Sequence, residues 1–216
     1  MPKATFFNLS KEKADRIIEI AIEEFKEHSY ENASINRIVE GAEISKGSFY
    51  QYFEDKKDLY KYILEKAEKK RNKYLLDSIK EENYLSFFDS LEKLFVAEAK
   101  FAIEQPELSM IVLDFIKNSD ITFKKEILED GLCTNRIFKE LLLEGIDNKD
   151  IDEDIDIELN IFFLASIYAS VLEYHIYRVN FDCEKTIKYI NNIIKFLKNG
   201  AKSKKKSIRN IEDRFY

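Results

Sequence analysis

Apolar residues recur at spacings of three and four along most of the chain, which is the repeat of an α-helix with one buried face. In the first periodic segment, for example, Ile18, Ala21, Ile22 and Phe25 fall on one side of the helix. The chain has only five glycines and two prolines, so long helices can run without interruption. The pattern therefore predicts an all-α protein.

The boundaries of the helices are indicated by capping residues. Serines at positions 10, 34 and 45 are suitable N-caps, and Asp55 with Asp58 resembles an acidic pair that starts a helix. Pro106 separates two further segments. The predicted helices cover residues 10–28, 34–41, 46–52, 56–80, 84–104, 107–118, 120–145, 155–180 and 183–199.

Two helical segments and the tail have unusual composition. Residues 161–172 are almost wholly apolar, but they fall short of the ~20 residues needed to cross a bilayer. We expect them to form a helix that is buried on nearly all sides. The helix at 56–80 carries a basic patch that is typical of a solvated face, formed by Lys66, Lys69, Lys70, Arg71 and Lys73. Residues 201–216 are basic and poor in apolar residues, which predicts a disordered tail.

The charge of the protein limits how it can bind nucleic acid. The net charge is −6, and residues 1–60 hold nine basic and twelve acidic residues. A protein that coats nucleic acid through charge alone should be basic. Any DNA binding must therefore depend on a local surface of suitable shape.

Residues 34–53 contain the most informative pattern. Two short helices joined by a tight turn are the arrangement of a helix-turn-helix, which presents its second helix to the major groove. On that second helix Phe49 and Phe53 share one face, whereas Gly47 and Gln51 lie near the centre of the opposite face. The alternative interpretation is an ordinary surface helix with polar residues outside.

The exposed face of the second helix has chemistry that suits a DNA groove. Glycine at position 47 permits close approach, and Gln51 can hydrogen-bond to an adenine edge. The hydroxyl groups of Tyr50 and Ser48 flank this face and can reach phosphates. Ser45, with the free N–H groups of the first turn, forms a seat for a phosphate, and the neighbouring Lys46 can reach a base or a phosphate.

The stretch from about residue 8 to 60 resembles the DNA-binding domain of the TetR/AcrR family, and the run SKGSFYQYFEDKKDLY at residues 45–60 is specific to it. The resemblance covers about a quarter of the chain. Its other matching residues are Ala21, Ile22, Glu23, Glu24, Phe25, Ser34, Ile35, Asn36, Arg37, Ile38, Val39, Ala42 and Ile44.

The resemblance implies a role for individual positions. Recognition-helix contacts with DNA are implied for Lys46, Gly47, Ser48, Tyr50 and Tyr52. Contacts from the preceding helix are implied for Ser34 and Arg37, and Lys56 is implied to hold a phosphate. The chain departs from the family at Glu43, where glycine is usual. A positive φ there would cost on the order of 1 kcal/mol in a non-glycine residue, and the carboxylate would lie near DNA.

The resemblance also implies that the rest of the chain senses a ligand and forms a dimer. The fold expected is an N-terminal three-helix helix-turn-helix domain (1–55), a larger helical ligand-sensing and dimerisation domain (56–200), and the tail (201–216). A stripe on the last helix favours a homodimer interface, formed by Ile187, Ile190, Ile194 and Leu197.

An aromatic-rich second domain favours an apolar or aromatic effector, although aromatic residues at helical spacing are more often simply core. The candidate ligand-binding residues are Phe95, Glu98, Phe115, Tyr168 and His175. Glu98 is the most informative of them, because it lies on or beside an apolar face and a buried carboxylate needs a partner.

The sequence favours neither an enzyme nor a metalloprotein. Two distant histidines and the lack of a phosphate loop or a nucleophile motif predict that the chain has no catalytic site and no cofactor. The acidic run at 150–158 lacks the glycine and glutamate of a calcium loop, because Ile155 and Ile161 occupy those positions, so we interpret it as the start of a helix. Cys133 and Cys183 have no metal or redox spacing.

These observations predict a cytoplasmic, sequence-specific regulator of transcription with no membrane partner. The main hypothesis is a repressor that binds a near-palindromic double-stranded operator as a homodimer and leaves it when a small effector binds. An architectural DNA-binding protein of the same fold without a ligand is the alternative. An activator is also compatible with the sequence.

Overall fold

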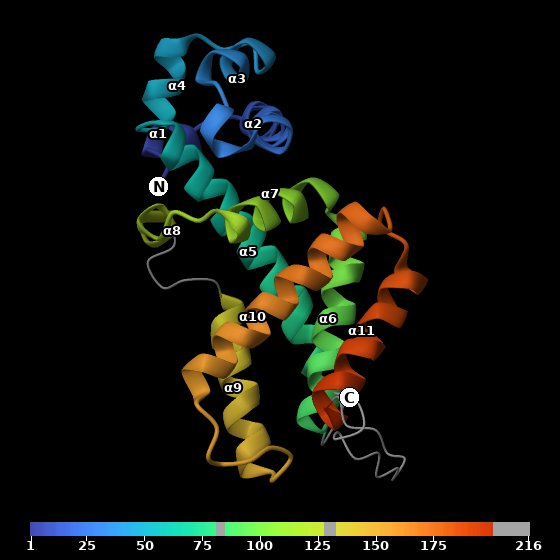
Figure 1. The fold of residues 1–216 in the computed structure, drawn as a ribbon. Coiled ribbons are helices and arrows are strands. Elements are labelled where there is room, and N and C mark those ends of the chain that lie inside the picture. The colour runs from blue at the N-terminus through green and yellow to red at the C-terminus, as the bar shows by residue number, and fades with distance from the viewer. Residues whose placement is uncertain (81–84, 128–132, 201–216) are drawn as a thin grey trace, which may run out of the picture.

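The computed structural model describes residues 1–80, 85–127 and 133–200, and all regular structure in these ranges is helical. Figure 1 shows the elements in order. They are α1 (Ala4–Phe7), α2 (Lys11–Asn32), α3 (Ile35–Gly41), α4 (Lys46–Tyr52), α5 (Lys56–Lys80), α6 (Phe87–Glu104), α7 (Pro106–Lys117), α8 (Ile121–Ile127), α9 (Cys133–Asp147), α10 (Ile157–Glu173), the π-helix η1 (Tyr174–Arg178) and α11 (Cys183–Asn199).

The predicted caps are confirmed. The side chains of Ser10, Ser34 and Ser45 each accept a hydrogen bond from a backbone N–H in the first turn of the helix that follows. Asp55 accepts from the N–H of Asp58 at the start of α5, and Asp58 accepts in return from the N–H of Glu54. These caps satisfy donors that a helix leaves without intrahelical partners, which explains why the starts of these helices were predictable.

The predicted helix at 120–145 corresponds to two described helices, α8 and α9, and the residues between them, 128–132, lie outside the described residues. Phe123 and Ile127 of α8 pack into the hydrophobic cluster around the N-terminal helices. Ile137 and Phe138 of α9 pack into a different cluster, lower in the molecule. α8 and α9 therefore pack in different parts of the core. The predicted tail (201–216) lies outside the described residues.

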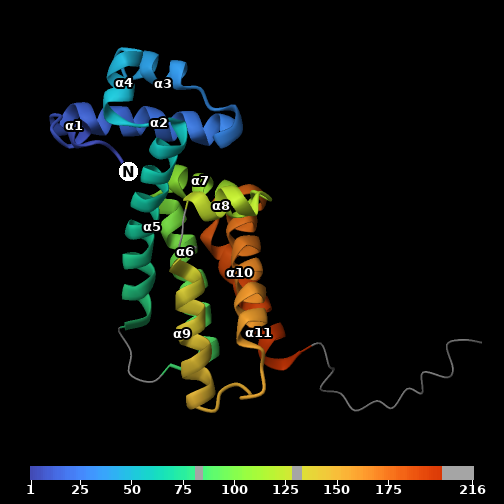
Figure 2. The same ribbon diagram turned by 90° about the vertical axis from the view of Figure 1, so that its left-hand side faces the viewer.

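The elements form an N-terminal head on an elongated helical body (Figure 1). In both views α3 and α4 lie at the outer end of the head, with α2 between them and the rest of the molecule (Figure 2). α5 begins in the head and runs down into the body beside α6. The outward pair α3 and α4 is therefore held far from α9, α10 and α11.

Two main hydrophobic clusters form the core. The first joins the head to the upper half of α5 and to α7 and α8, with Phe25, Phe49, Phe53 and Tyr60 among its buried aromatics. The second joins the lower half of α5 to α6, α9, α10 and α11. Because the first cluster crosses the predicted boundary at residue 55, the head is packed directly onto the body. The division into domains at that residue stays a prediction.

α10 is less buried than the sequence led us to expect. Ile161, Leu164 and Tyr168 face the second cluster, but Phe162 and Phe163 are 72% and 47% exposed. The prediction that residues 161–172 are buried on nearly all sides is therefore wrong for one whole face. The segment Ile157–Arg178 is long and apolar enough to cross a membrane, a test that core helices also pass, and its other face forms part of the protein core.

Candidate nucleic-acid interface

The α3–turn–α4 unit has the geometry of a helix-turn-helix. Residues 42–45 connect the two helices, and the N–H of Ile44 donates to the carbonyl of Val39 across the turn. At Gly41, an added Cβ would meet Ile20 of α2 at 2.9 Å, so glycine permits the close approach of α3 to α2. The turn is therefore short and firmly placed on the helix beneath it.

α4 is fixed by its inner face and offers its outer face to solvent. Phe49 and Phe53 are fully buried, each burial being worth about 1.5–3 kcal/mol. Tyr50 is 43% exposed. The other exposed residues of this outer face are Ser45, Lys46, Gly47 and Gln51. The hydroxyl of Ser48, which is half-buried, lies 2.8 Å from that of Ser45 at the start of the helix.

Gly47 has no structural reason to be glycine within this chain. A Cβ at this position would meet only the Oγ of Ser45, at 3.7 Å, which is ordinary van der Waals contact. Its backbone is in the helical region, and glycine in a helix costs about 0.5–1 kcal/mol relative to alanine. A residue that weakens its own helix while the chain has room for a side chain points to close approach by an external partner.

Glu43 adopts the strained backbone that the family resemblance implies. Its φ is +54°, in the left-handed region where a side chain is unfavourable. Its carboxylate forms an ion pair with Arg16 of α2, which also contacts the carbonyl of Gly41. The negative charge of Glu43 is therefore partly compensated at the edge of the outward surface.

Ser34 and Arg37 are placed by a buried carboxylate to which the sequence pattern assigned no role. Glu24 of α2, only 7% exposed, accepts from the N–H of Ser34 at 2.7 Å and from Arg37 Nε and Nη2 at 2.9 and 2.6 Å. Burial alone would raise the pKa of Glu24, but the hydrogen bonds from Arg37 and Ser34 outweigh it and lower that pKa. A glutamate beside Ala21 and Phe25 on an apolar face was the signal for this site.

Two implied DNA contacts need correction. The ammonium group of Lys56 donates to the carbonyl oxygens of Tyr30, Glu31 and Ala33 at 2.6–3.1 Å, which uses all three of its donors. Lys56 therefore caps the end of α2 and is not free to hold a phosphate in this structure. Tyr52 is 7% exposed and packs against Phe6, so its ring belongs to the core and not to the outward face.

The candidate ligand-binding residues do not form one group. Phe95 and Tyr168 pack together in the second cluster, with ring centroids 6.2 Å apart, and Glu98 lies beside Tyr168. Phe115 belongs to the first cluster. His175 is buried elsewhere, with Nδ1 2.7 Å from the hydroxyl of Thr186. The structure therefore brings Phe95, Glu98 and Tyr168 together, whereas Phe115 and His175 lie in other parts of the core.

Arg71 belongs to this buried neighbourhood, and its assignment to a solvated basic patch was wrong. Its side chain is fully buried, with Nη2 2.6 Å from the hydroxyl of Thr134 and 2.5 Å from Glu68 Oε1. Nε lies 3.9 Å from Glu98 Oε2. Burial raises the pKa of Glu98, an effect that Arg71 and Tyr168 oppose. Arg71 thus connects α5 with α6 and α9 through polar contacts inside the core.

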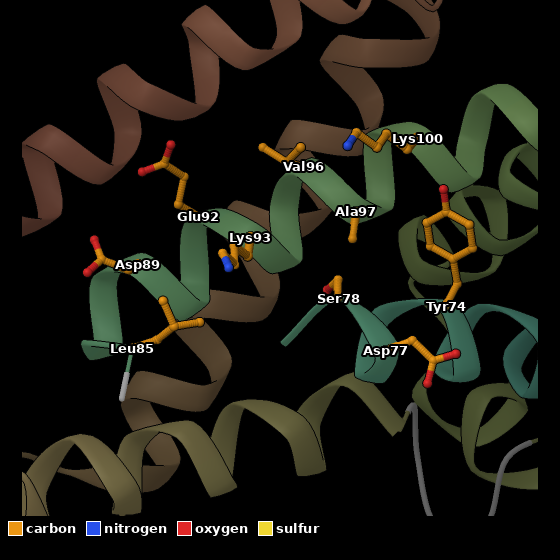
Figure 3. Close-up of a pocket in the computed structure, with 10 residues that line it drawn as sticks. All are labelled: Tyr74, Asp77, Ser78, Leu85, Asp89, Glu92, Lys93, Val96, Ala97 and Lys100. Atoms are coloured by element: carbon orange, nitrogen blue, oxygen red, sulfur yellow. The ribbon is translucent and has the colours of Figure 1, made fainter. Parts of the chain in front are cut away.

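A cleft of about 900 Å³ lies between α5 and α6 (Figure 3). Tyr74, Asp77 and Ser78 reach it from α5, and Val96, Ala97 and Lys100 from α6. Its remaining lining residues are Leu85, Asp89, Glu92 and Lys93. None of the five candidate ligand-binding residues lines this cleft, so it does not coincide with the neighbourhood of Glu98.

The predicted homodimer stripe also needs correction. Ile190 is fully buried and Ile194 is 6% exposed, because both pack into the second cluster of their own chain. Ile187 and Leu197 are half-buried. The large apolar side chains that remain exposed on α10, η1 and α11 are those of Leu159, Phe162, Phe163, Tyr177 and Phe196. We call the three on α10, namely Leu159, Phe162 and Phe163, the α10 face.

Comparison with known proteins identifies the N-terminal region. Residues 17–63 match the family model described as bacterial regulatory proteins, tetR family. Over 57 residues the chain is 42% identical to an HTH-type transcriptional regulator of Staphylococcus aureus. The aligned segment covers 26% of this chain and 31% of that protein, so it spans less than a third of the relative's length.

Similarity of fold extends over nearly the whole chain. A TetR family transcriptional regulator from Chloroflexus aurantiacus superposes with a TM-score of 0.73 and 28% identity, covering 93% of this chain and 98% of that one. The regulator FadR from Bacillus subtilis, solved in complex with stearoyl-CoA, gives a TM-score of 0.69 and 20% identity, with 87% and 99% covered. Together with the helix-turn-helix described above, these matches show that the chain belongs to the TetR family of transcriptional regulators.

Proposed function

We propose that this protein is a dimeric regulator of transcription that binds double-stranded DNA through the outer face of α4. The observation that carries the proposal is Gly47. It lies exposed between Lys46 and the hydrogen-bonding side chains of Tyr50 and Gln51, at a position where the chain itself has room for a side chain. A helix that must approach base edges closely accounts for that choice.

The acidic head requires that binding depend on this local surface. Lys46 and the first-turn N–H groups near Ser45 supply positive potential at one end of α4. Tyr50, Ser48 and the free side of Arg37 supply hydrogen-bond donors to phosphates, and Gln51 supplies base readout. Phosphate contacts then set the register and Gln51 contributes sequence preference.

A homodimer through the α10 face supplies two such heads. Phe162 and Phe163 are large aromatic side chains on one exposed side of α10, and aromatic residues are enriched where protein interfaces form. Two heads related by a two-fold axis match a near-palindromic operator.

A small effector acting on the body would make the protein a ligand-released repressor. The aromatic neighbourhood of Phe95 and Tyr168 favours an apolar or aromatic molecule. The FadR structure with stearoyl-CoA adds support from fold alone, and makes acyl-CoA a reasonable first probe. Regulation of this kind takes place in the cytoplasm.

A change of conformation in the helical body can reach the N-terminal head through two sets of contacts. α5 runs through both clusters from Lys56 to Lys80, and α2 of the head packs along α7. The hydroxyl of Ser29 donates to Asp114 at 3.2 Å across the α2–α7 contact. A displacement of α7 or α5 would therefore change the position of α4.

The alternative, an architectural DNA-binding protein without an effector, is favoured by one observation. The neighbourhood of Glu98 is densely packed, since Phe95, Glu98 and Tyr168 are each at most 2% exposed. A ligand would have to open this core or use the cleft between α5 and α6.

The central test is selection of DNA from a random duplex library by the purified full-length protein. Enrichment of a near-palindromic sequence, lost in Gln51→Ala or Tyr50→Phe, supports the proposal. Failure to enrich any sequence would contradict it. Thermal melting with stearoyl-CoA and a panel of small apolar compounds, with and without the selected duplex, then separates a ligand-released repressor from the architectural alternative.

A further inference from the structure

The end of α4 is capped by residues from the very start of the described chain. Lys3 Nζ donates to the carbonyl of Tyr50 at 3.0 Å, and the N–H of Lys3 donates to the carbonyl of Tyr52 at 2.8 Å. The hydroxyl of Thr5 donates to the carbonyl of Gln51 between them. The last carbonyls of a helix have no intrahelical partners, so this segment satisfies three successive acceptors.

Phe6 anchors the capping segment. Its side chain is 2% exposed, with its ring centroid 4.9 Å from that of Phe53 and 5.6 Å from that of Tyr62 of α5. The next residue, Phe7, is 59% exposed. We refer to residues 3–6 as the N-terminal clip, because a buried aromatic holds it in place while its polar groups grip α4.

Two of the residues whose carbonyls accept hydrogen bonds from the clip also have side chains on the outer face of α4. Tyr50 and Gln51 carry carbonyls held by the clip, and their side chains lie on the exposed face. The first turn of α4 is fixed by the Ser45 cap, and rotation about its axis is limited by the buried Phe49. At the other end of α4, where Tyr52 and Phe53 are buried, the clip adds three hydrogen bonds to the last carbonyls.

We propose that Lys3 and Thr5 are positioning residues for DNA recognition, which act by fixing the last turn of α4 without touching base edges. The inference rests on the proposed DNA-binding function. Recognition needs side chains held to within about 0.5 Å, so a loose last turn weakens base readout more than phosphate binding. The clip therefore contributes to specificity.

The variants Lys3→Met and Thr5→Val, singly and together, remove the two side-chain donors while nearly keeping side-chain size, and leave the backbone N–H of Lys3 in place. Lys13→Met and Thr122→Val are matched controls, because both side chains are exposed and neither residue belongs to the clip or to α4. Thr5→Ser restores a hydroxyl and should rescue. The DNA probes are a duplex selected by the wild-type protein and a scrambled duplex of equal composition.

The double variant should lose about tenfold in discrimination between the two duplexes, the scale expected when two hydrogen bonds are lost. Its affinity for the scrambled duplex should match that of Lys13→Met. Amide hydrogen exchange in the last turn of α4 should become faster, with exchange in α10 unchanged. Thr5→Val alone keeps the charge of Lys3 and removes only one hydrogen bond. It can therefore be used to measure the same changes in discrimination and exchange if the double variant unfolds.

Unchanged discrimination together with unchanged exchange would overturn the proposal, as would equal losses of affinity for both duplexes. If the wild-type protein selects no sequence, the proposed function fails. The exchange measurement then still decides whether the clip holds α4.

Discussion

Arg37 of α3 and Glu24 of α2 form a bidentate contact, in which Nε and Nη2 of the guanidinium both donate to the buried carboxylate. The same carboxylate accepts from the N–H of Ser34 at the start of α3. One side chain of the supporting helix therefore sets both the start of α3 and the direction of a predicted DNA contact. The contact is charge-assisted, and such hydrogen bonds are among the stronger ones in proteins.

The first prediction concerns the pH dependence of this contact. The pKa of Glu24 is lowered from 4.5, so its stabilising contribution is present above that pH and is lost as the pH falls through the lowered pKa. Glu24→Gln should lower the free energy of unfolding by about 1–3 kcal/mol at neutral pH. The difference from wild type should shrink in acid. Denaturant unfolding from pH 3 to 7 measures this, with exposed Glu23→Gln as control, and a pH-independent difference would contradict it.

The second prediction concerns Gly47. Gly47→Ala should stabilise the folded protein by about 0.5–1 kcal/mol, because alanine is the better helix former and its Cβ meets no obstacle. The same change should weaken binding to a selected duplex by roughly tenfold, because a methyl group enters the close contact. Thermal melting and binding titrations should therefore move in opposite directions. Unchanged binding would remove Gly47 from the interface.

The third prediction separates strain from charge at Glu43. Glu43→Gly should raise stability by about 1 kcal/mol by relieving the positive φ, whereas Glu43→Gln keeps the strain and should not. Both remove a negative charge near DNA and should tighten binding at low salt. The gain should fade as salt is added. Equal stability of the two variants would show that the turn is unstrained.

The fourth prediction concerns the α10 face. Wild-type protein should sediment at twice the chain mass of 25.6 kDa. Phe162→Glu should sediment as a monomer, because it places a charge within an apolar interface. Ile121→Glu is the matched control, since Ile121 is 69% exposed on α8, away from this face. A monomeric wild-type protein at micromolar concentration would count against the two-headed mechanism.

The fifth prediction concerns Glu98 and has the opposite sign to the first. Burial raises the pKa of Glu98 from 4.5. The contribution of this group to the free energy of unfolding is therefore fully present below pH 4.5, where the carboxyl is protonated, and is lost as the pH rises through the raised pKa. Glu98→Gln should therefore gain stability relative to wild type as the pH increases, with little difference near pH 4. Exposed Glu140→Gln is the control for unfolding measurements across this range. A difference that narrows with rising pH would show that Arg71 keeps Glu98 ionised.

The parts of the fold that depend on local signals were predictable. The serine caps and the spacing of Phe49 and Phe53 located α3 and α4, and α5 begins and ends where its capping pair and pattern indicated. These features are determined by residues close together in sequence. The outer face of α4 followed directly from helical geometry.

Features that depend on distant packing were not predictable. An apolar stripe does not show which partner covers it, so Ile190 was assigned to an interface although it packs inside its own chain, and the exposure of Phe162 was missed. In the sequence, Arg71 cannot be distinguished from the exposed lysines near it, because its buried position depends on contacts with Thr134 and Glu68. The grip of Lys3 on α4 joins residues 47 apart, with no local signal.

The capping of α2 by Lys56 has a mechanical consequence for operator geometry. The first residue of α5, Lys56, donates to three carbonyls at the end of α2. The start of α5 and the head should therefore move as one rigid unit, with little bending at residues 53–56. In the proposed dimer, the distance between the two heads then depends on the length and phase of α5 together with the packing of α2 on α7. Inserting one residue into α5 would advance the head by about 1.5 Å and turn it by about 100°. Operators preferred by such variants should differ in half-site spacing and helical phase, while the half-site sequence stays the same.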